Sequence, residues 1–523
     1  MSSTFRLRVP RAPVYGSRHM VVSGHSLASL AGQRILDRGG SVIDAMIACS
    51  AALCVVIPQA TSVGGDAFIL YRDGKTRKTV GLNASGHAPK AATPDKFPGG
   101  IKVRGARSFS VPGIVRGWAE MHKKYGKLPW ADLFDDAIAL AAMGHPLSRV
   151  LAKGLEQYHD DVLADPGCAA LYMPGGKALN AGDIIKQPAL ANTLRTIAKE
   201  GDAAFYEGAL GRAICTYAAK HGGLTAPDEF AGYAPEWVEP LNTNYRGFTV
   251  NVMPPNSYGV LMLLQLNALG GLTAADYRDD ATRLGYLVRA MKAAFAEGQH
   301  HIADPRVKPA PIKALLSAET TRRLQAQVKN GAPQARVGGR GGTSCITIAD
   351  ADGNGCTVVQ SVFHVFGAAF LDPETGVLMN DRMMGFTTDP SHASVVAPRK
   401  RPSHTLNPVL IEQGDRIKYL IATPGGPAQT ITLVQAITNM ADRGMELAQA
   451  VEAPRWAIDF GGKVLLDGDY PDEIAAKLAA QGYPAARSED VTPFGSVKAI
   501  EMMDSGALQG VADYRREAFA VGA

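Results

Sequence analysis

A threonine that follows two glycines, at the start of an expected strand, is the part of this sequence best suited to chemistry. Gly341-Gly342-Thr343 ends a stretch from Lys329 that is rich in glycine and polar residues, and Cys345 to Ala349 alternates as a strand does. If the Gly342–Thr343 bond is cut, Thr343 gains an α-amine whose reference pKa of about 7.7–8.0 leaves roughly a tenth of it unprotonated at neutral pH. That amine can accept the proton of its own hydroxyl, which is one way of activating threonine. We therefore predict a self-cleaving precursor with Gly342–Thr343 as its cleavage site and Thr343 as its nucleophile.

Gly342 is expected to supply the backbone freedom that a strained scissile bond requires. A second glycine motif, Pro424-Gly425-Gly426, lies between an expected strand, Lys418 to Ala422, and an expected helix, Thr430 to Met440. Backbone N–H groups at such a turn can converge on a developing oxyanion, because no side chain obstructs the approach. Taken alone, an ordinary loop threonine or a tight packing turn would explain either motif.

The elements that must position these groups can be predicted from periodicity and turn residues. Apolar residues at helical spacing predict a helix over Leu27 to Leu36, and a near capping box at Ser41 and Asp44 begins a second helix that ends at Ile57. The remaining expectations are helices over Ala203 to Lys220 and Leu284 to Glu297, strands at Ala67 to Tyr71, Thr79 to Leu82, Tyr245 to Met253 and Cys356 to Val362, and a hairpin turn at Asp352 to Gly355. Strands early and late in a mostly helical chain predict a layered α+β architecture.

Several short stretches then occur in a fixed order. They are residues 35–45 (ILDRGGSVIDA), Pro58-Gln59-Ala60, Gly64-Gly65, Val111-Pro112-Gly113, Tyr245-Arg246-Gly247, Met253-Pro254-Pro255, residues 350–354 (DADGN), Phe366-Gly367 and Pro424-Gly425-Gly426. From about Met20 to beyond Trp456, the chain resembles the gamma-glutamyltransferase family in the order and spacing of these motifs.

The resemblance implies a four-layer αββα sandwich of the N-terminal-nucleophile hydrolase type. It also implies one precursor cut into a large subunit, residues 1–342, and a small subunit, residues 343–523, which stay associated as one compact unit. The family's nucleophile falls on Thr343, the hydroxyl that contacts it on Ser361, and its oxyanion glycines on Gly425 and Gly426. The paired hydroxyls of the family's substrate pocket fall on His404 and Thr405.

The substrate clamp of the family is altered in this chain. Ser85 replaces the arginine of an Arg-Glu-x-Ala-Pro stretch, Phe363 replaces an asparagine, and Arg382 and Gly385 replace the glutamine and aspartate that grip an α-amine. Because an acidic group is lost and an arginine gained, we hypothesise an acyl group with a carboxylate held by Arg382. Relatives with altered pockets include oxamate amidohydrolase and cephalosporin (glutaryl) acylases. A structural ion pair remains the alternative role for Arg382.

Two histidines and a cysteine lie near the expected pocket. His364 and His404 could orient the substrate or tune the Thr343 amine, and a structural role is open for each. Cys345 is two residues past the cut and is not expected to be the nucleophile.

Composition excludes several classes of function. The 523 residues carry a net charge of only +5, with no dense basic block, so nucleic acid is not an expected partner. No leader or membrane-spanning stretch is expected, and six cysteines without metal-ligand spacing favour a reduced cytoplasmic protein with no metal and no cofactor. The expected partner is a small-molecule amide. The balance of hydrolysis and acyl transfer, and assembly into a homo-oligomer, stay open.

The alternative from another class is an uncleaved binding scaffold, and cleavage separates the two. On a denaturing gel we expect two bands, and N-terminal sequencing of the smaller should begin Thr343-Ser344-Cys345. Replacing Thr343 by Ala should abolish both cleavage and turnover, because it removes the attacking hydroxyl. A single full-length band from the unaltered protein would favour the scaffold.

Overall fold

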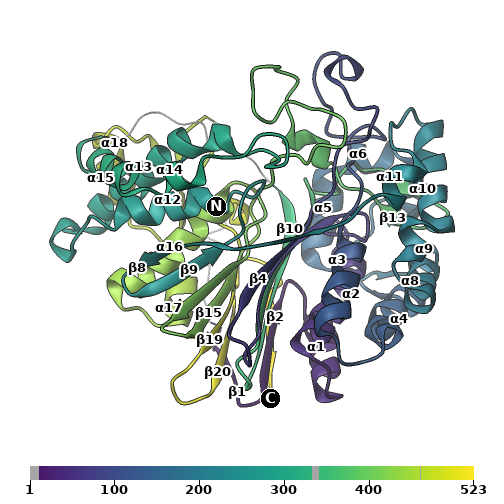
Figure 1. Ribbon diagram of the computed structural model, residues 1–523, viewed down its shortest axis with the longest axis horizontal. Helices are drawn as coiled ribbons and strands as arrows, with labels where there is room; N and C mark the ends of the chain where they lie inside the picture. Colours follow the sequence, from purple (N-terminus) through teal and green to yellow (C-terminus); the bar gives the residue numbers. More distant parts are fainter. Residues whose placement is uncertain (1–10, 332–340, 460) are drawn as a thin grey trace, which may run out of the picture.

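Two seven-stranded antiparallel sheets pack face to face in the computed structural model, which describes residues 11–331, 341–459 and 461–523 (Figure 1). The first sheet, in spatial order, is β1 (Val14–Gly16), β20 (Leu508–Ala512), β19 (Lys498–Met502), β15 (Arg416–Ala422), β14 (Val409–Gln413), β9 (Phe248–Val252) and β8 (Leu241–Tyr245). The second is β21 (Phe519–Gly522), β2 (His19–Ser23), β10 (Gly342–Asp350), β11 (Gly355–Phe363), β3 (Asp66–Arg72), β4 (Thr79–Ala84) and β7 (Glu236–Val238). Most of the expected linker, residues 332–340, lies outside the described residues.

The space between the sheets is filled by apolar side chains from both of them. Phe68 on β3 and Cys345 on β10 belong to the same buried cluster as Leu420 on β15 and Ile500 on β19. Successive residues of a strand point to opposite faces, and Ile346 accordingly joins the cluster beneath the helices of the outer layer. Strand β10 is therefore buried on both faces, which holds its first residues in one fixed position.

Helices cover the outer face of each sheet, which gives the four layers αββα. Over the second sheet lie α1 (Ser26–Asp37), α2 (Val42–Val56), α3 (Ile114–Tyr125), α4 (Asp135–Met143), α8 (Pro188–Glu200) and α10 (Ala209–Lys220). Over the first lie α12 (Gly259–Leu269), α13 (Asp280–Gly298), α15 (Ala318–Asn330), α16 (Ala428–Arg443), α17 (Leu447–Glu452) and α18 (Asp472–Ala480). The layered α+β architecture predicted from the sequence is confirmed.

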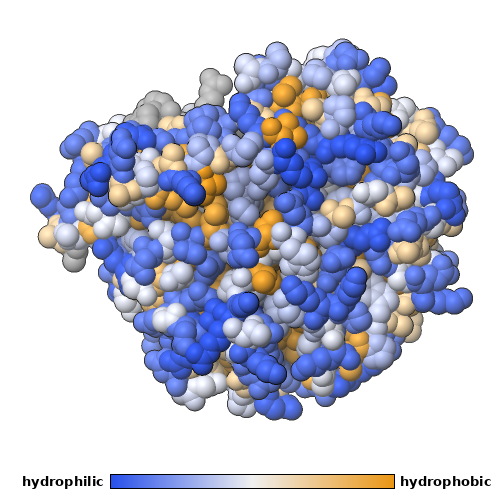
Figure 2. All heavy atoms as spheres, in the orientation of Figure 1, coloured by the Kyte–Doolittle hydropathy of each residue, from blue (hydrophilic) through white to orange (hydrophobic). Residues whose placement is uncertain are grey.

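Smaller elements complete the chain between these layers. They are helices α5 (Arg149–Gln157), α6 (His159–Leu163), α7 (Pro166–Tyr172), α9 (Ala203–Tyr206), α11 (Pro227–Ala231) and α14 (Ile312–Leu315), and the strand groups β5 (His145–Pro146) with β6 (Ile184–Ile185), β12 (Leu371–Asp372) with β13 (Val377–Leu378), and β16 (Trp456–Ile458) with β17 (Val464–Asp467) and β18 (Ala485–Ser488). The face drawn in Figure 2 is mostly hydrophilic, with hydrophobic groups in small separate patches. Within the described ranges, no helix combines the length and the apolar character needed to cross a bilayer.

Two of the expected elements are wrong in their extent. The helix expected over Ala203 to Lys220 is broken into α9 and α10, since Gly208 interrupts it in an extended conformation. The strand expected over Tyr245 to Met253 begins only at Phe248, as β9, because Arg246 and Gly247 both adopt positive φ angles and form the turn of a hairpin with β8. The other expected helices and strands form within a few residues of their predicted bounds.

Both sheets combine strands from before and after position 343. Strand β10 pairs with β2 on one side, and β11 pairs with β3. In the other sheet β14 pairs with β9, and β20 pairs with β1. The segments on either side of the expected cut are therefore interwoven through backbone hydrogen bonds.

The predicted capping box at the start of α2 is present and does more than cap the helix. Ser41 and Asp44 exchange side chain to backbone hydrogen bonds at 2.8 and 3.0 Å. The fully buried Asp44 carboxylate also accepts the N–H groups of Lys127 and Leu128 at 2.9 and 3.0 Å. One carboxylate therefore fixes the loop after α3 to the start of α2.

Replacing Asp44 by Ala should destabilise this outer layer, because it removes the cap and leaves the loop N–H groups without their acceptor. We expect the free energy of unfolding to fall by about 2 kcal/mol, measured as a lower urea midpoint. Asp44→Asn is the matched control, since it retains one acceptor oxygen and should lose less. Equal midpoints for the Ala variant and the unaltered protein would contradict this role.

Candidate active site

Thr343 is the second residue of β10 and is buried beside Ser361 of the neighbouring strand β11. The two hydroxyl oxygens are 3.2 Å apart. The β10–β11 register is irregular between Gly342 and Ser344, which leaves Thr343 without a paired residue on β11. Such a bulge re-aims a side chain at the end of a strand. The sequence placed Thr343 and Ser361 in one site, and the structure brings them into contact.

The Ser361 hydroxyl links the nucleophile to the bond expected to break. It donates a short hydrogen bond to the carbonyl oxygen of Gly342 and accepts the N–H of Phe363 at 2.7 Å. A serine hydroxyl has one proton to donate. Since that proton is directed to Gly342, the hydrogen bond between the two hydroxyls runs from Thr343 to Ser361.

Glycine is required at position 342, directly before Thr343, because a side chain would not fit there. A Cβ atom on Gly342 would lie 2.6 Å from the carbonyl oxygen of Gln59 and 3.0 Å from that of His364. Gly342 does not adopt a positive φ angle. The expectation that it supplies an unusual backbone conformation is therefore wrong, and close packing is the reason that a side chain is excluded.

The Pro424-Gly425-Gly426 turn lies next to this segment, between the end of β15 and the start of α16. Gly425 and Gly426 adopt φ angles of +139° and +57°, which favour glycine. The amide nitrogen of Gly426 would be 3.3 Å from a Cβ atom built on Gly341. Within the described part of the chain neither glycine N–H donates a hydrogen bond. Two unengaged amides thus lie near the bond to be cut, as an oxyanion site requires.

Arg382 is completely buried beside Phe363 and Asp66. Its guanidinium lies 4.0 Å from the centre of the Phe363 ring, and its Nε atom is 3.7 Å from a carboxylate oxygen of Asp66. None of its three side-chain nitrogens forms a hydrogen bond with a described residue. Burial lowers the pKa of Arg382 to about 10, and Asp66 opposes that shift. The side chain therefore remains a cation at neutral pH, with unused donors.

Asp66 is a site residue that the sequence analysis missed. It lies directly opposite Ser361 in the β3–β11 ladder and accepts the N–H of Gly86 at 2.9 Å. Burial raises the pKa of Asp66 to about 6, and Arg382 works against that rise. The available signal was an acidic residue directly after Gly64-Gly65, at the start of an apolar strand. Its partner on β11, Ser361, is far away in the sequence, so the pairing could not be inferred.

His404 precedes β14 of the first sheet and contacts Asp66, which begins β3 of the second sheet. Its Nε2 atom is 3.3 Å from an Asp66 carboxylate oxygen, and its ring packs 4.7 Å from the ring of Phe68. Burial lowers the pKa of His404 well below its ordinary value, so the ring is neutral and donates to Asp66. The adjacent Thr405 hydroxyl is buried and forms no hydrogen bond within the described residues. Substrate contacts by these two residues stay predictions.

His364 is held by a second acidic residue that the sequence analysis missed. Asp381 is fully buried, accepts the backbone N–H of His364 at 2.9 Å and forms a short hydrogen bond with Nδ1 of its ring. The imidazole is 28% exposed, and its centre lies 4.3 Å from that of the Phe363 ring, with the two planes tilted by 43°. Asp381 therefore fixes the orientation of the ring, and Nε2 forms no hydrogen bond with a described residue.

Ser85 lies in the same region, but its hydroxyl is already used. It donates to Asn83 at 2.6 Å and accepts from the Asn256 amide at 3.3 Å. Ser85 stands where the family has an arginine, and its side chain carries no charge. A direct contact between Ser85 and substrate stays a prediction.

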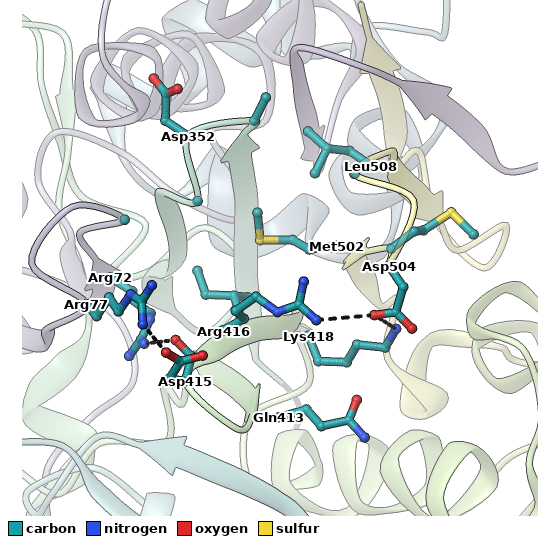
Figure 3. Close-up of a pocket in the computed structure, with 16 residues that line it drawn as sticks. Arg72, Arg77, Asp352, Gln413, Asp415, Arg416, Lys418, Met502, Asp504 and Leu508 are labelled. Carbon is teal, nitrogen blue, oxygen red and sulfur yellow. Dashed lines mark hydrogen bonds and ion pairs between the residues drawn. The ribbon is translucent and has the colours of Figure 1, made fainter.

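A cavity of about 280 Å³ also opens at the hairpin ends of the sheets, and Figure 3 shows its lining. Its cations are paired: Arg77 with Asp415, Arg416 with Asp504, and Lys418 with Glu501 at 3.0 Å. It contains neither the nucleophile nor the glycine turn, and we do not assign catalysis to it. Among the described residues, no group of three or more His, Cys, Asp and Glu side chains could hold a metal ion.

Comparison with known proteins identifies the arrangement. The family model of gamma-glutamyltranspeptidase matches residues 28–523. This chain belongs to the gamma-glutamyltranspeptidase family. It is therefore an N-terminal-nucleophile hydrolase, a self-processing amidohydrolase, and the resemblance inferred from its motifs is confirmed.

Relatives within the family carry different names. The chain is 35% identical to the glutathione hydrolase-like YwrD proenzyme of Bacillus subtilis (strain 168), over 97% of this chain and 99% of that protein. It is 30% identical to the oxamate amidohydrolase proenzyme of Klebsiella pneumoniae, over 96% and 98% of the two chains. The crystal structure of a cephalosporin acylase from Bacillus halodurans superimposes with a TM-score of 0.93 at 31% identity, covering 100% of this chain and 99% of the other. The αββα fold of the family is confirmed.

Replacing Ser361 by Ala should slow both cleavage and turnover, because Thr343 then loses the hydroxyl that bonds both to it and to the Gly342 carbonyl. We expect each rate to fall about 10- to 100-fold, measured by the appearance of the small subunit on a gel and by kcat of the cleaved fraction. Ser361→Thr retains the hydroxyl and should retain most of both rates. Unchanged maturation in the Ala variant would remove Ser361 from the site.

Proposed function

We propose that this protein hydrolyses or transfers the acyl group of a small amide that carries a carboxylate on its acyl side. The observation that carries the proposal is the buried guanidinium of Arg382, whose three nitrogens lack hydrogen bonds to described residues. A buried cation with unused donors is costly unless a ligand satisfies it. A carboxylate satisfies it best, because its two oxygens match the guanidinium fork.

Asp66 neither replaces that ligand nor excludes it. Its oxygen is 3.7 Å from Nε of Arg382, beyond hydrogen-bond distance, and the same oxygen receives the ring of His404. Asp66 thus holds the cation in place electrostatically while leaving its donors free. This supports a binding role for Arg382 over the alternative of a structural ion pair.

The precursor would mature by attack of the Thr343 hydroxyl oxygen on the carbonyl carbon of Gly342. The Ser361 hydroxyl already bonds to the oxygen of that carbonyl, so it polarises the bond under attack. The C–N bond breaks as the hydroxyl proton passes to the Thr343 nitrogen, the acyl group moves to the Thr343 oxygen as an ester, and water hydrolyses the ester. The products are the Gly342 carboxylate, which ends a large subunit of residues 1–342, and the Thr343 α-amine, which begins a small subunit of residues 343–523.

Turnover would use the same hydroxyl on an external amide. The α-amine takes the hydroxyl proton as the Thr343 oxygen attacks, and the N–H groups of Gly425 and Gly426 stabilise the oxyanion. The α-ammonium then returns the proton to the leaving amine, and the acyl group remains on Thr343 as an ester. Attack by water releases an acid, and attack by a second amine completes a transfer.

The names of the relatives define the compounds to test. Oxamate and glutaryl amides carry a carboxylate without an adjacent α-amine, whereas gamma-glutamyl amides carry both. We favour the first two because the glutamine and aspartate with which the family binds the α-amine are replaced by Arg382 and Gly385 in this chain. His364, with its ring fixed by Asp381, is placed to contact the substrate as well.

The test compares rates of hydrolysis of oxamate, glutaryl anilide, gamma-glutamyl anilide and the uncharged pentanoyl anilide. We expect the first two to be preferred over the gamma-glutamyl compound. In Arg382→Met, kcat/KM for glutaryl anilide should fall about 10- to 100-fold, because a charged hydrogen-bonded contact is lost, while kcat/KM for pentanoyl anilide should not fall.

Arg382→Lys is the matched variant, since it keeps the charge but cannot form the bidentate contact. Its kcat/KM for glutaryl anilide should lie between those of the Met variant and the unaltered protein. A clear preference of the unaltered enzyme for gamma-glutamyl anilide would defeat the proposal. So would an equal loss on both anilides in the Met variant.

A further inference from the structure

Lys498 is a buried lysine directly behind the glycine turn of the active site. It begins β19, where it pairs with Ala422, the last residue of β15 before the turn. The residue is 2% exposed, and its ammonium group donates to the carbonyl and hydroxyl oxygens of Ser496 at 2.8 and 3.1 Å. Burial lowers the pKa of Lys498, with Cys345 and Asp513 opposing that shift. A cation is seldom buried so completely without a carboxylate partner.

A chain of hydrogen bonds connects this ammonium group with the turn. The backbone N–H of Ser496 donates to the hydroxyl of Thr423 at 3.0 Å, and that hydroxyl donates to the carbonyl of Pro424 at 3.1 Å. A Cβ atom on Gly495 would lie 2.5 Å from the Thr423 hydroxyl oxygen, so the loop before Ser496 packs directly against the turn. Lys498 therefore supports the backbone that presents the amides of Gly425 and Gly426.

The same ammonium group also approaches the nucleophile strand. Cys345, two residues after Thr343, points into the space between the sheets; burial raises the pKa of its thiol, and the Lys498 cation opposes that rise. Val359 and Ser361 point to the same face of β11, the face between the sheets, and Ser361 contacts the Thr343 hydroxyl. Lys498 shares a face of β19 with Ile500, so the lysine also lies between the sheets.

Most of the other charges around Lys498 form ion pairs. Asp513 pairs with Arg455 at 2.6 Å and with Arg515 at 3.3 Å, and Arg515 also pairs with Asp467 at 2.6 Å. Arg516, a second cation near Cys345, makes no ion pair within 4.0 Å in the described ranges and donates to the carbonyl oxygen of Thr492 at 3.4 Å. Lys498 likewise makes no ion pair within 4.0 Å in those ranges. Unpaired positive charge in this cluster therefore lies on both Lys498 and Arg516, and Lys498 is the one hydrogen-bonded to Ser496.

We propose that Lys498 is a positioning residue of the reaction, whose uncompensated charge keeps the Thr343 α-amine unprotonated and favours the oxyanion at the glycine turn. The inference rests on the proposed role of Thr343 as an N-terminal nucleophile. A positive charge nearby disfavours the ammonium form of an amine, so it lowers the pH at which the base becomes available. It also attracts the negative charge that develops on the substrate oxygen.

Other charged groups act on the same amine from the substrate side. Arg382 adds a second positive charge, and Asp66 and Asp381 add negative ones, while His364 lies beside Asp381. Lys498 differs from all of these because it approaches from behind the glycine turn, where substrate does not reach. Its substitution should therefore change the protonation of Thr343 without changing the recognition of the acyl carboxylate.

The experiment compares the pH dependence of kcat/KM in Lys498→Met and in the unaltered enzyme, with glutaryl anilide as substrate. The acid limb should move to higher pH by about 0.5–1 unit, because loss of the cation raises the pKa of the α-amine. At pH values below the limb this appears as a 3- to 10-fold loss of kcat/KM. A second measurement follows the pH dependence of carbamoylation of the small-subunit N-terminus by cyanate, by mass spectrometry, and should shift in the same direction.

Two further variants separate charge from packing. Lys498→Gln keeps a donor for Ser496 without the charge and should shift the limb as the Met variant does, and it serves in its place if the Met variant does not mature. Lys498→Arg keeps the charge and should restore the limb. Lys418→Met is the matched control, because Lys418 lies on β15 in the lining of the cavity drawn in Figure 3, which contains no residue of the site, and pairs with Glu501 at 3.0 Å; its limb should not move.

An unmoved acid limb in a folded, cleaved Met or Gln variant would overturn the proposal. An equal shift in the Arg variant would also overturn it, since the charge would then not be the cause. These failures are distinct from failure of the proposed function, in which the unaltered enzyme itself would not cleave the carboxylated amides.

Discussion

The shared hydroxyl of Ser361 is the contact on which the rest of the site depends. One oxygen atom contacts the Thr343 hydroxyl, the Gly342 carbonyl and the N–H of Phe363. This is possible only because β10 and β11 are neighbours near the centre of a sheet and are buried on both faces. The helices over one face and the second sheet over the other remove the freedom that would let these groups separate. The four layers thus hold this hydroxyl in one position.

Two buried cations lie in and behind the proposed site. Arg382 comes from the substrate side, with donors that no described residue uses, and Lys498 comes from behind the glycine turn, without an ion pair in the described ranges. Each costs free energy to desolvate, and neither is fully compensated by the fold. Stability alone would favour apolar side chains at both positions. We propose that both cations are retained for the charge of the substrate carboxylate and of the oxyanion.

The parts of the site that could be predicted from sequence are those with a local signal. Thr343 and Gly425 occur in glycine motifs beside recognisable strands, and α2 begins with a capping box that needs only Ser41 and Asp44. Asp66 and Asp381 were missed because their partners come from distant strands, and register cannot be inferred from one strand alone. The break at Gly208 in a helical run was also missed, although glycine is a common interruption of helices.

The interleaving of strands across position 343 determines how the cut protein would behave when unfolded. Before the cut, every strand pairing joins parts of one chain, and refolding is a unimolecular process. After it, the pairings of β10 with β2, β11 with β3, β14 with β9, and β20 with β1 would each join two chains. The pieces could not part without opening both sheets, so the mature enzyme would hold together as firmly as a single chain while folded. Once the sheets are opened, however, each chain would have to find the other by diffusion. Recovery of the mature enzyme would therefore depend on protein concentration, whereas recovery of the precursor would not.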